Sequence, residues 1–340
     1  MTHRQAVTAA LRFRRPFPVP YQVGFTHLMH QRMVAYTGDP NYADAIDNAI
    51  AAAYLTKPET EVSPGLFRDE FGVVWDRRET DQDIGNVHQF LLQGKSDLDR
   101  YELPLVDEAF VRHSMQRLMD TAGDQFRVAA IGFSLFERAW TLRGMENLLC
   151  DMVEEPAFVH ELLDRITKRN LAIIRIALQY DIDCFHFGDD WGQQKGLIMG
   201  PTHWRTFLKP CLARMYGAVR EAGKFVSQHS CGDIRDVMDD LHDIGLNMYQ
   251  TFQPEIYGLA YAQRLRNRIT IWGGISTQQD LPRRTPDEIR AITRELLRAF
   301  PEGGLVASPT HDIPGDVPPE NVLAMLDVLD HQVRETEPRA

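Results

Sequence analysis

His229 and Cys231 lie two positions apart in the stretch QHSCGD, residues 228–233. An imidazole nitrogen and a thiolate sulfur are donors that zinc favours in proteins. An apolar segment precedes the pair and a glycine follows it, so a strand that ends here would direct both side chains toward the same open space. The other interpretation is packing, because a free cysteine usually behaves as a small buried hydrophobe. The stretch by itself leaves both interpretations open.

Adjacent acids follow a second apolar segment, at Asp189 and Asp190. Two neighbouring carboxylates repel each other, which favours a role at a site for at least one of them over a simple turn cap. Glu137 follows another apolar segment and suits either a catalytic acid or an exposed acid in the first turn of a helix. These three acids are the predicted catalytic residues. The predicted substrate-binding residues are His27, Trp191, Gln253, Glu255 and Trp272, with a surface position as the alternative for His27 and packing as the alternative for both tryptophans.

Seven apolar segments are typical of short strands, and helical patterns separate them. Alternation of strand and helix predicts a parallel sheet. With seven such units, and an eighth expected in the N-terminal half, a closed (β/α)8 TIM barrel fits better than a doubly wound sheet. No G-x-G-x-x-G follows the first segment, which also argues against a dinucleotide-binding fold. The predicted strands are 19–25, 126–133, 183–188, 224–230, 247–252, 269–274 and 304–309.

Helix signals agree with this alternation. Pro201 opens a helical pattern that Gly223 closes, and Thr285 with Glu288 predicts a capping box before another helix. Residues 318–333 predict the last helix in the same style. Residues 39–112 are too many for one crossover, so we expect a helical insertion or lid there, together with N-terminal helical additions to the barrel. The whole chain, residues 1–340, is predicted to be a single domain.

Composition and charge exclude several classes of protein. The chain has 340 residues, of which 44% are hydrophobic and 25% charged, and its formal charge is -11. Such an acidic balance argues against a nucleic-acid binder, which would carry basic stripes. No apolar run is long enough to span a bilayer and the N-terminus lacks a signal-peptide pattern, so we expect a cytoplasmic protein. The four cysteines are dispersed, which fits reduced thiols better than a disulfide framework.

A barrel would bring the metal-ligating residues together. Catalytic residues of such folds gather at the carboxyl ends of the strands. His229, Cys231 and His311 would then lie on strand ends with two strands between them, and would meet across the barrel mouth. Three protein ligands with a fourth position for solvent or substrate is the pattern of catalytic zinc. A zinc ion would also deprotonate a thiol that arrives at the open position.

Five longer segments carry a family resemblance: FRRPFPVP, FHFGDDWGQQKGLIMGPTHWRTFLKP, GKFVSQHSCGDI, WGGIST and PTHDIPGDVPPENV. Together they resemble the uroporphyrinogen decarboxylase superfamily, in particular its methyltransferase-like and uncharacterised branches. The resemblance implies a (β/α)8 barrel that is often a homodimer. In the cobamide-dependent methyltransferases of this superfamily, an H-x-C motif and a later cysteine bind zinc, which activates a thiol to take a methyl group from a corrinoid protein. His229 and Cys231 match the first two ligands, and His311 stands where the family has the cysteine.

The decarboxylases of the superfamily hold substrate carboxylates with an arginine-rich N-terminal segment and stabilise a pyrrole with an aspartate. This chain has GFTHLMHQRM near that place, with Arg32 alone nearby, which argues against a highly carboxylated porphyrinogen because its charges would lack partners. We therefore favour a zinc-dependent, methyltransferase-like enzyme that passes a methyl group between a corrinoid, carried by a partner protein, and a thiol or other small acceptor. The alternatives are a metal-free decarboxylase or lyase using Asp189 or Asp190 on a small carboxylated or tetrapyrrole substrate, and a non-catalytic binder of a corrinoid, tetrapyrrole or metabolite.

Overall fold

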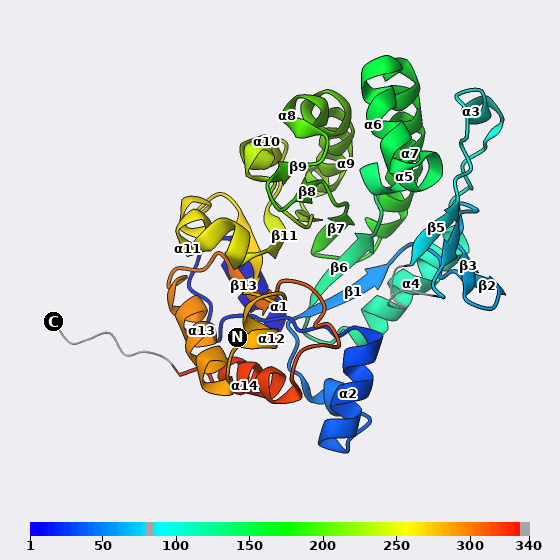
Figure 1. The fold of residues 1–340 in the computed structure, drawn as a ribbon. Coiled ribbons are helices and arrows are strands. Elements are labelled where there is room, and N and C mark those ends of the chain that lie inside the picture. Colours follow the sequence, from blue (N-terminus) through cyan, green and yellow to red (C-terminus); the bar gives the residue numbers. More distant parts are fainter. Residues whose placement is uncertain (79–84, 334–340) are drawn as a thin grey trace. The chain divides into compact units, whose positions relative to one another are not determined.

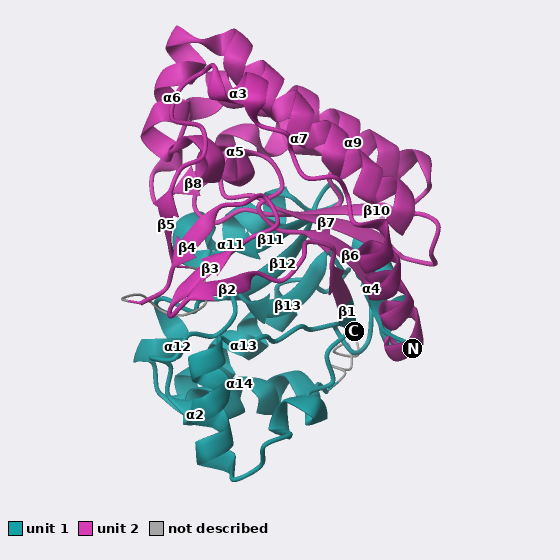
Figure 2. Ribbon diagram, turned by 90° about the vertical axis from the view of Figure 1, so that its right-hand side faces the viewer, with its two compact units in different colours: residues 1–51, 124–126, 248–340 teal, residues 52–123, 127–247 magenta. Residues whose placement is uncertain are grey.

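Parallel strands alternate with helices along most of the chain in the computed structural model, which describes residues 1–78 and 85–333 (Figure 1). The chain divides into two units, which are coloured separately in Figure 2. Unit 1 comprises residues 1–51, 124–126 and 248–340, and unit 2 comprises residues 52–123 and 127–247. Because each unit is assembled from separate stretches of sequence, neither could be recognised as a continuous domain from the chain alone.

Unit 2 contains the parallel strands β6 (Phe126–Ile131), β7 (Cys184–Gly188) and β10 (Phe225–His229). Phe225 pairs with Cys184, and His229 pairs with Gly188, so β7 and β10 end at the same level. Nearly every residue of these strands is buried, as expected for a parallel sheet that is covered on both faces. The common level of the strand ends therefore places the residues that follow β7 beside those that follow β10.

Helices connect these strands. The predicted helix from Pro201 to Gly223 is present as a continuous run of three segments, and Gly223 ends it with a positive φ of 72°. The helices of unit 2 are α3 (Asp97–Arg100), α4 (Glu108–Thr121), α5 (Phe136–Arg143), α6 (Met145–Glu154), α7 (Pro156–Ala177), α8 (Gly200–His203), the π-helix η2 (Trp204–Leu208), α9 (Lys209–Glu221), the 3-10 helix η3 (Arg235–Val237) and α10 (Met238–Asp243).

The insertion expected over residues 39–112 contains short strands as well as short helices, apart from residues 79–84, which lie outside the described residues. Four strands form an antiparallel sheet in the order β2-β3-β4-β5. The segments are three or four residues long, too short for the alternation of apolar and polar residues to stand out in the sequence. The strands are β2 (Thr60–Ser63), β3 (Leu66–Arg68), β4 (Val74–Asp76) and β5 (Asn86–Gln89), and a separate pair is formed by β8 (Gly192–Gln193) and β9 (Gly196–Leu197).

Unit 1 contains a second set of parallel strands in the order β11-β12-β13. Every residue of β12 and β13 is buried. The predicted capping box is present, because the Thr285 side chain accepts the Glu288 N–H and the Glu288 side chain accepts the Thr285 N–H. The elements are α1 (His3–Leu11), α2 (His27–Thr37), η1 (Tyr42–Ala45), β11 (Met248–Phe252), α11 (Pro254–Arg264), β12 (Thr270–Ile275), α12 (Asp280–Arg283), α13 (Pro286–Arg298), β13 (Leu305–Pro309) and α14 (Pro319–Asp330).

The N-terminal segment departs from the predicted pattern. Residues 19–25 form no regular strand, and only Tyr21 and Phe25 make isolated bridges, to Ala307 and Ile313. Prolines at 18 and 20 lack the N–H groups that a full strand ladder requires. The strand β1 (Ile50–Tyr54) lies in the N-terminal half, where a further strand was expected without a position. Among the described residues, no helix is long and apolar enough to cross a membrane.

His3 ties helix α1 to two other segments of unit 1. Its imidazole lies 3.1 Å from Asp47 and 3.1 Å from Asp124. Burial by itself lowers the pKa of His3, but the hydrogen bonds and charges of the two aspartates outweigh burial and raise the pKa above its ordinary value. The protonated imidazole is therefore favoured in the folded chain.

We predict that His3 stabilises the fold at low pH. A raised histidine pKa contributes stability that is complete below about pH 6.5 and is lost as the pH rises through the raised value. Chemical unfolding at a series of pH values, for the wild type and His3→Gln, measures the contribution. The wild type should be more stable than His3→Gln at pH 6. This difference in the free energy of unfolding should shrink toward pH 9, as the imidazole loses its proton. A difference that grows with pH would contradict this assignment.

Candidate functional site

The residues after β10 form a tight loop that begins the candidate site. His229 is the last residue of β10, and the Ser230 Oγ accepts the Trp191 N–H at 2.9 Å. Gly232 has a φ of 77°, and a Cβ added to Gly192 would come within 2.7 Å of the Gly232 carbonyl carbon. Two glycines therefore allow the loop after β10 to lie against the segment after β7. This close approach fixes the direction of the Cys231 side chain.

Three ligand atoms of unit 2 meet at the His229 imidazole. The His229 Nε2 lies 3.6 Å from the Cys231 Sγ and 3.3 Å from the Asp190 Oδ1. The Asp190 Oδ1 also accepts the Cys231 N–H at 2.8 Å. A nitrogen, a sulfur and an oxygen thus surround one position, and they come from the ends of two adjacent strands.

The charges of this group are strongly coupled. Burial raises the pKa of Asp190, but hydrogen bonds from His229 and from Cys231 outweigh burial and lower the pKa to about 2. Burial also lowers the pKa of His229, whereas its contacts with Asp190 and Cys231 raise that pKa well above its ordinary value. Both shifts favour a protonated His229 imidazole beside an ionised Asp190 carboxylate.

The same geometry fits a zinc ion. Atoms bound to one tetrahedral zinc through bonds of about 2.0 and 2.3 Å lie roughly 3.5 Å apart. The distance of 3.6 Å between the His229 Nε2 and the Cys231 Sγ agrees with that separation. A metal ion and the proton on Nε2 would compete for the same position, since both are attracted by the carboxylate and the sulfur.

Asp189 has a different environment from its neighbour. It is completely buried, and its carboxylate accepts the N–H groups of Leu135 at 3.2 Å, Phe136 at 2.9 Å and Glu137 at 2.8 Å. A fourth hydrogen bond comes from the Trp191 Nε1 at 2.5 Å. Burial raises the pKa of Asp189 to about 6, although these four donors oppose the shift. Its carboxylate thus satisfies the first N–H groups of α5, which would otherwise lack partners.

Glu137 stands at the start of α5, where Asp189 holds the backbone. Burial raises the pKa of Glu137 well above its ordinary value, and the charges of Asp190 and Asp189 add to the shift. The raised pKa favours the protonated side chain, which can donate a hydrogen bond or a proton. The sequence alone offered an exposed helix acid as the alternative, whereas the side chain is half-buried in the structure.

Trp191 supports the site rather than facing an opening. Its side chain is fully buried and packs edge-to-face on Trp204, with ring centroids 5.5 Å apart. Its indole N–H is engaged by Asp189. In this structure its contacts are with packing partners of unit 2, and a role in contacting substrate stays a prediction.

His186 was missed by the sequence analysis. It lies on β7, and its ring centroid is 6.4 Å from that of His229. Burial lowers the pKa of His186 to about 3, and its Nδ1 lies 2.9 Å from the Ser227 Oγ. The neutral His186 ring therefore lies edge-to-face beside the His229 ring. The histidine stands within the apolar strand CFHFG, and a polar residue inside a fully apolar strand was the signal that could have identified it.

The remaining predicted residues belong to unit 1, and most of them lie at or near the ends of helices and strands. His27 begins α2 and is exposed, Gln253 precedes α11 and is buried, and Glu255 is exposed in the first turn of α11. Trp272 is buried within β12. His311 is exposed two residues after the end of β13. The substrate-binding roles of these residues, and a common site of His311 with His229 and Cys231, stay predictions.

Comparisons with known proteins agree with the fold. Residues 76–332 match the family described as Uroporphyrinogen decarboxylase (URO-D). The chain belongs to this family. The URO-D match covers most of the chain, and a uroporphyrinogen decarboxylase of Methylococcus capsulatus is 25% identical over 257 residues, which are 70% of this chain and 69% of that protein.

The fold of this URO-D family member is shared with a solved structure. A methyltransferase from Methanosarcina mazei superposes with a TM-score of 0.73 over 97% of this chain and 98% of the other, at 17% identity. Such a likeness shows the fold, which is of the TIM-barrel type predicted from the alternating strands and helices. The two named relatives carry different activities, so the reaction has to be argued from the site.

Replacing Asp189 with asparagine should destabilise the chain by about 2–4 kcal/mol. The side-chain NH2 of asparagine would face buried N–H donors, which now have a carboxylate oxygen as their acceptor. Asp190→Asn is the matched control, since its carboxylate is partly exposed and we expect a loss of about 1 kcal/mol. Denaturant unfolding of both variants measures the difference. Equal losses would show that Asp189 does not anchor the N-terminus of α5.

Proposed function

We propose that this URO-D family member is a zinc-dependent, methyltransferase-like enzyme. In this proposal a methyl group passes between a corrinoid, bound to a partner protein, and a thiol or other small acceptor. The observation that carries the proposal is the approach of the His229 Nε2 and the Cys231 Sγ to 3.6 Å beside the Asp190 carboxylate. Packing alone gives no reason to gather a nitrogen, a sulfur and an oxygen around one position.

His229, Cys231 and His311 would hold the zinc ion. His311 follows the carboxyl end of β13, and His229 is the last residue of β10. The carboxyl ends of barrel strands are where catalytic residues occur. A histidine in the third position gives a set of two nitrogens and one sulfur, all of them donors that zinc accepts. When bound, the metal would lower the pKa of an acceptor thiol, so that its sulfur is present as the nucleophile at neutral pH.

The acids of unit 2 would orient the acceptor and hold protons. Asp190 stays ionised because its pKa is about 2, so its carboxylate can accept a hydrogen bond from the acceptor or from His229. Burial raises the pKa of Glu137, which favours its protonated form, so it would donate. Two carboxyl groups whose environments push their pKa values apart are the arrangement by which enzymes separate acid and base roles. Asp189 would act by positioning Glu137 through the backbone of α5.

Partners follow from the reaction. A corrinoid is too large to enter a closed barrel together with its carrier protein, so the carrier would dock over the strand ends. Gln253, Glu255, Trp272 and His27 are the residues of unit 1 that we propose for contacts with the substrate. We further propose that the chain acts as a homodimer in the cytoplasm.

Zinc content tests the proposal directly. We expect about one zinc ion per chain in the purified wild type, as for a three-ligand catalytic site. Cys231→Ala should lose the metal, and Cys150→Ala, which removes an exposed cysteine, should retain it. Elemental analysis after dialysis gives the content. If the wild type stays free of zinc after incubation with the metal, the proposal fails and the metal-free decarboxylase becomes the better hypothesis.

The third ligand has its own test. His311→Ala should weaken zinc binding by at least about 100-fold, because loss of a direct ligand exceeds the effect of losing an outer hydrogen bond. His27→Ala is the matched control, since it also removes an exposed histidine of unit 1. Competition with a chromogenic chelator yields the dissociation constants. Unchanged affinity in His311→Ala would assign the third position to another residue, with Asp190 the first to examine.

A further inference from the structure

A cavity of about 140 Å3 lies within unit 2, apart from the three ligand atoms described above. Its wall includes Thr56 and Lys57, which follow β1, and Gly132 and Phe133, which follow β6. The antiparallel sheet β2–β5 and the adjoining turn supply the other side. Substrates of barrel enzymes bind at the carboxyl ends of the strands, and this cavity is at the ends of two of them. It could hold about five water molecules at roughly 30 Å3 each, which is the size of a small metabolite.

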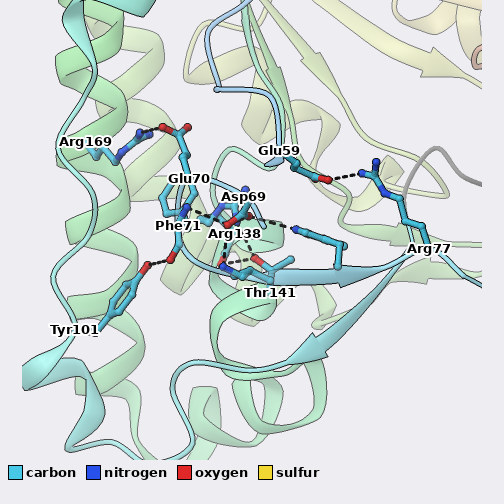
Figure 3. Close-up of polar contacts among 11 residues, drawn as sticks. Glu59, Asp69, Glu70, Phe71, Arg77, Tyr101, Arg138, Thr141 and Arg169 are labelled. Atoms are coloured by element: carbon cyan, nitrogen blue, oxygen red, sulfur yellow. Dashed lines mark hydrogen bonds and ion pairs between the residues drawn. The ribbon is translucent and has the colours of Figure 1, made fainter. Parts of the chain in front are cut away.

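Charges of both signs line the cavity in equal number. The basic residues are Lys57, Arg77 and Arg138, and the acids are Glu59, Asp69 and Glu70. Figure 3 shows Asp69 with Arg138, Glu70 with Arg169 and Glu59 with Arg77. A cavity with no net charge accepts a ligand with no net charge more readily than a simple anion or cation, because an ion would leave one sign unmatched.

Ion pairs hold these side chains in place. Arg138 Nη1 lies 2.6 Å from Asp69, and both side chains are 7% exposed. Arg169 Nη2 lies 2.6 Å from Glu70, and Arg77 lies 2.7 Å from Glu59. The Arg138 guanidinium also covers the Phe71 ring at 3.9 Å from its centroid. The polar wall is thus rigid before any ligand arrives, which reduces the entropy that binding would cost.

Three buried polar atoms of this wall make no hydrogen bond to the described residues. They are the Arg138 Nε, which is a donor, and the Glu70 Oε1 and Glu59 Oε2, which are acceptors, although the Glu59 Oε2 keeps its ion pair with Arg77. A buried polar atom without a partner costs free energy, and a network that serves only as a clamp has no reason to leave the Arg138 donor and the Glu70 acceptor without one. A ligand that carries one acceptor and one donor would satisfy these two atoms.

Two features favour an ammonium as the donor. Trp75 and Phe133 line the cavity with their rings 5.5 Å apart in an edge-to-face arrangement, and aromatic faces attract cations. Glu59 is a third acid in the wall, and burial raises its pKa despite the neighbouring Arg77. A cationic group on the ligand would offset the cost of keeping Glu59 and Glu70 ionised.

We infer that this cavity binds a small zwitterionic amino acid, with its carboxylate on the arginine side of the wall and its ammonium between the acids and the two aromatic rings. The carboxylate would accept from the Arg138 Nε, and the ammonium would donate to the Glu70 Oε1. The cavity limits the side chain to a few atoms. This binding does not require zinc, so the inference stands apart from the proposed function.

Calorimetric titration of the full chain with L-alanine tests the inference. We expect saturable binding of one alanine per chain. Propionate lacks the ammonium and ethylamine lacks the carboxylate, so each should bind at least about tenfold more weakly, since each loses a charge-assisted hydrogen bond. Absence of saturable alanine binding at millimolar concentration would overturn the inference and leave water as the occupant. Propionate binding as tightly as alanine would also overturn it, in favour of a site for simple carboxylates.

Variants locate the site. Glu70→Gln and Glu59→Gln should each weaken alanine binding at least about tenfold, and Glu59 is the safer change because its side chain is 23% exposed. Glu161→Gln is the matched control, since Glu161 pairs with Arg165 on α7 and does not line the cavity. Circular dichroism checks that each variant is folded. Wild-type affinity in both cavity variants would place the binding elsewhere and refute the assignment.

Cys231→Ala separates this inference from the zinc proposal. We expect it to bind alanine as the wild type does, because Cys231 does not line the cavity. Loss of zinc with retained alanine binding would support both ideas independently. Loss of alanine binding in Cys231→Ala would contradict the inference that the cavity works without the metal site.

Discussion

The buried carboxylate of Asp189 is the interaction on which unit 2 depends most. It accepts three consecutive N–H groups at the start of α5 and the indole N–H of Trp191, and so joins the end of β7 to the beginning of a helix. A charge can be buried here because four donors replace the water that it loses. The first turn of α5, which carries Glu137, takes its position from this joint.

Helix α5 begins at the Asp189 carboxylate and contributes side chains to two polar groups. Glu137, in its first turn, belongs with Asp190 and the His229 imidazole, and Arg138, the next residue, belongs to the cavity beside Asp69 and Glu70. Successive residues of a helix point about 100° apart, so one short helix serves two neighbouring polar groups. A change in the start of α5 would therefore be felt both by the proposed acid and by the proposed amino-acid site.

Asp189 and Asp190, the two acids after β7, have the same chemistry in the sequence but different surroundings in the structure. Asp189 is enclosed by donors from the backbone and from an indole, whereas Asp190 turns toward His229 and Cys231. Burial raises the pKa of Asp189 to about 6, whereas hydrogen bonds from His229 and Cys231 lower the pKa of Asp190 to about 2. Support of α5 and the contacts with His229 and Cys231 are thus divided between adjacent residues, and the charges of both aspartates help to raise the pKa of Glu137.

The sequence by itself determined the class of fold and the elements that carry the site. Apolar strands such as 183–188 and 224–230, the capping box at Thr285 and the H-x-C spacing are local patterns, so they could be predicted within a residue or two. The sheet β2-β3-β4-β5 could not be predicted from the sequence, because its strands are only three or four residues long and their formation depends on pairing with one another. Tertiary structure also decided that Asp189 supports α5, that His186 lies beside His229, and that Arg138 meets Asp69. Those contacts join residues far apart in the chain, and their energies depend on burial, which no local pattern records.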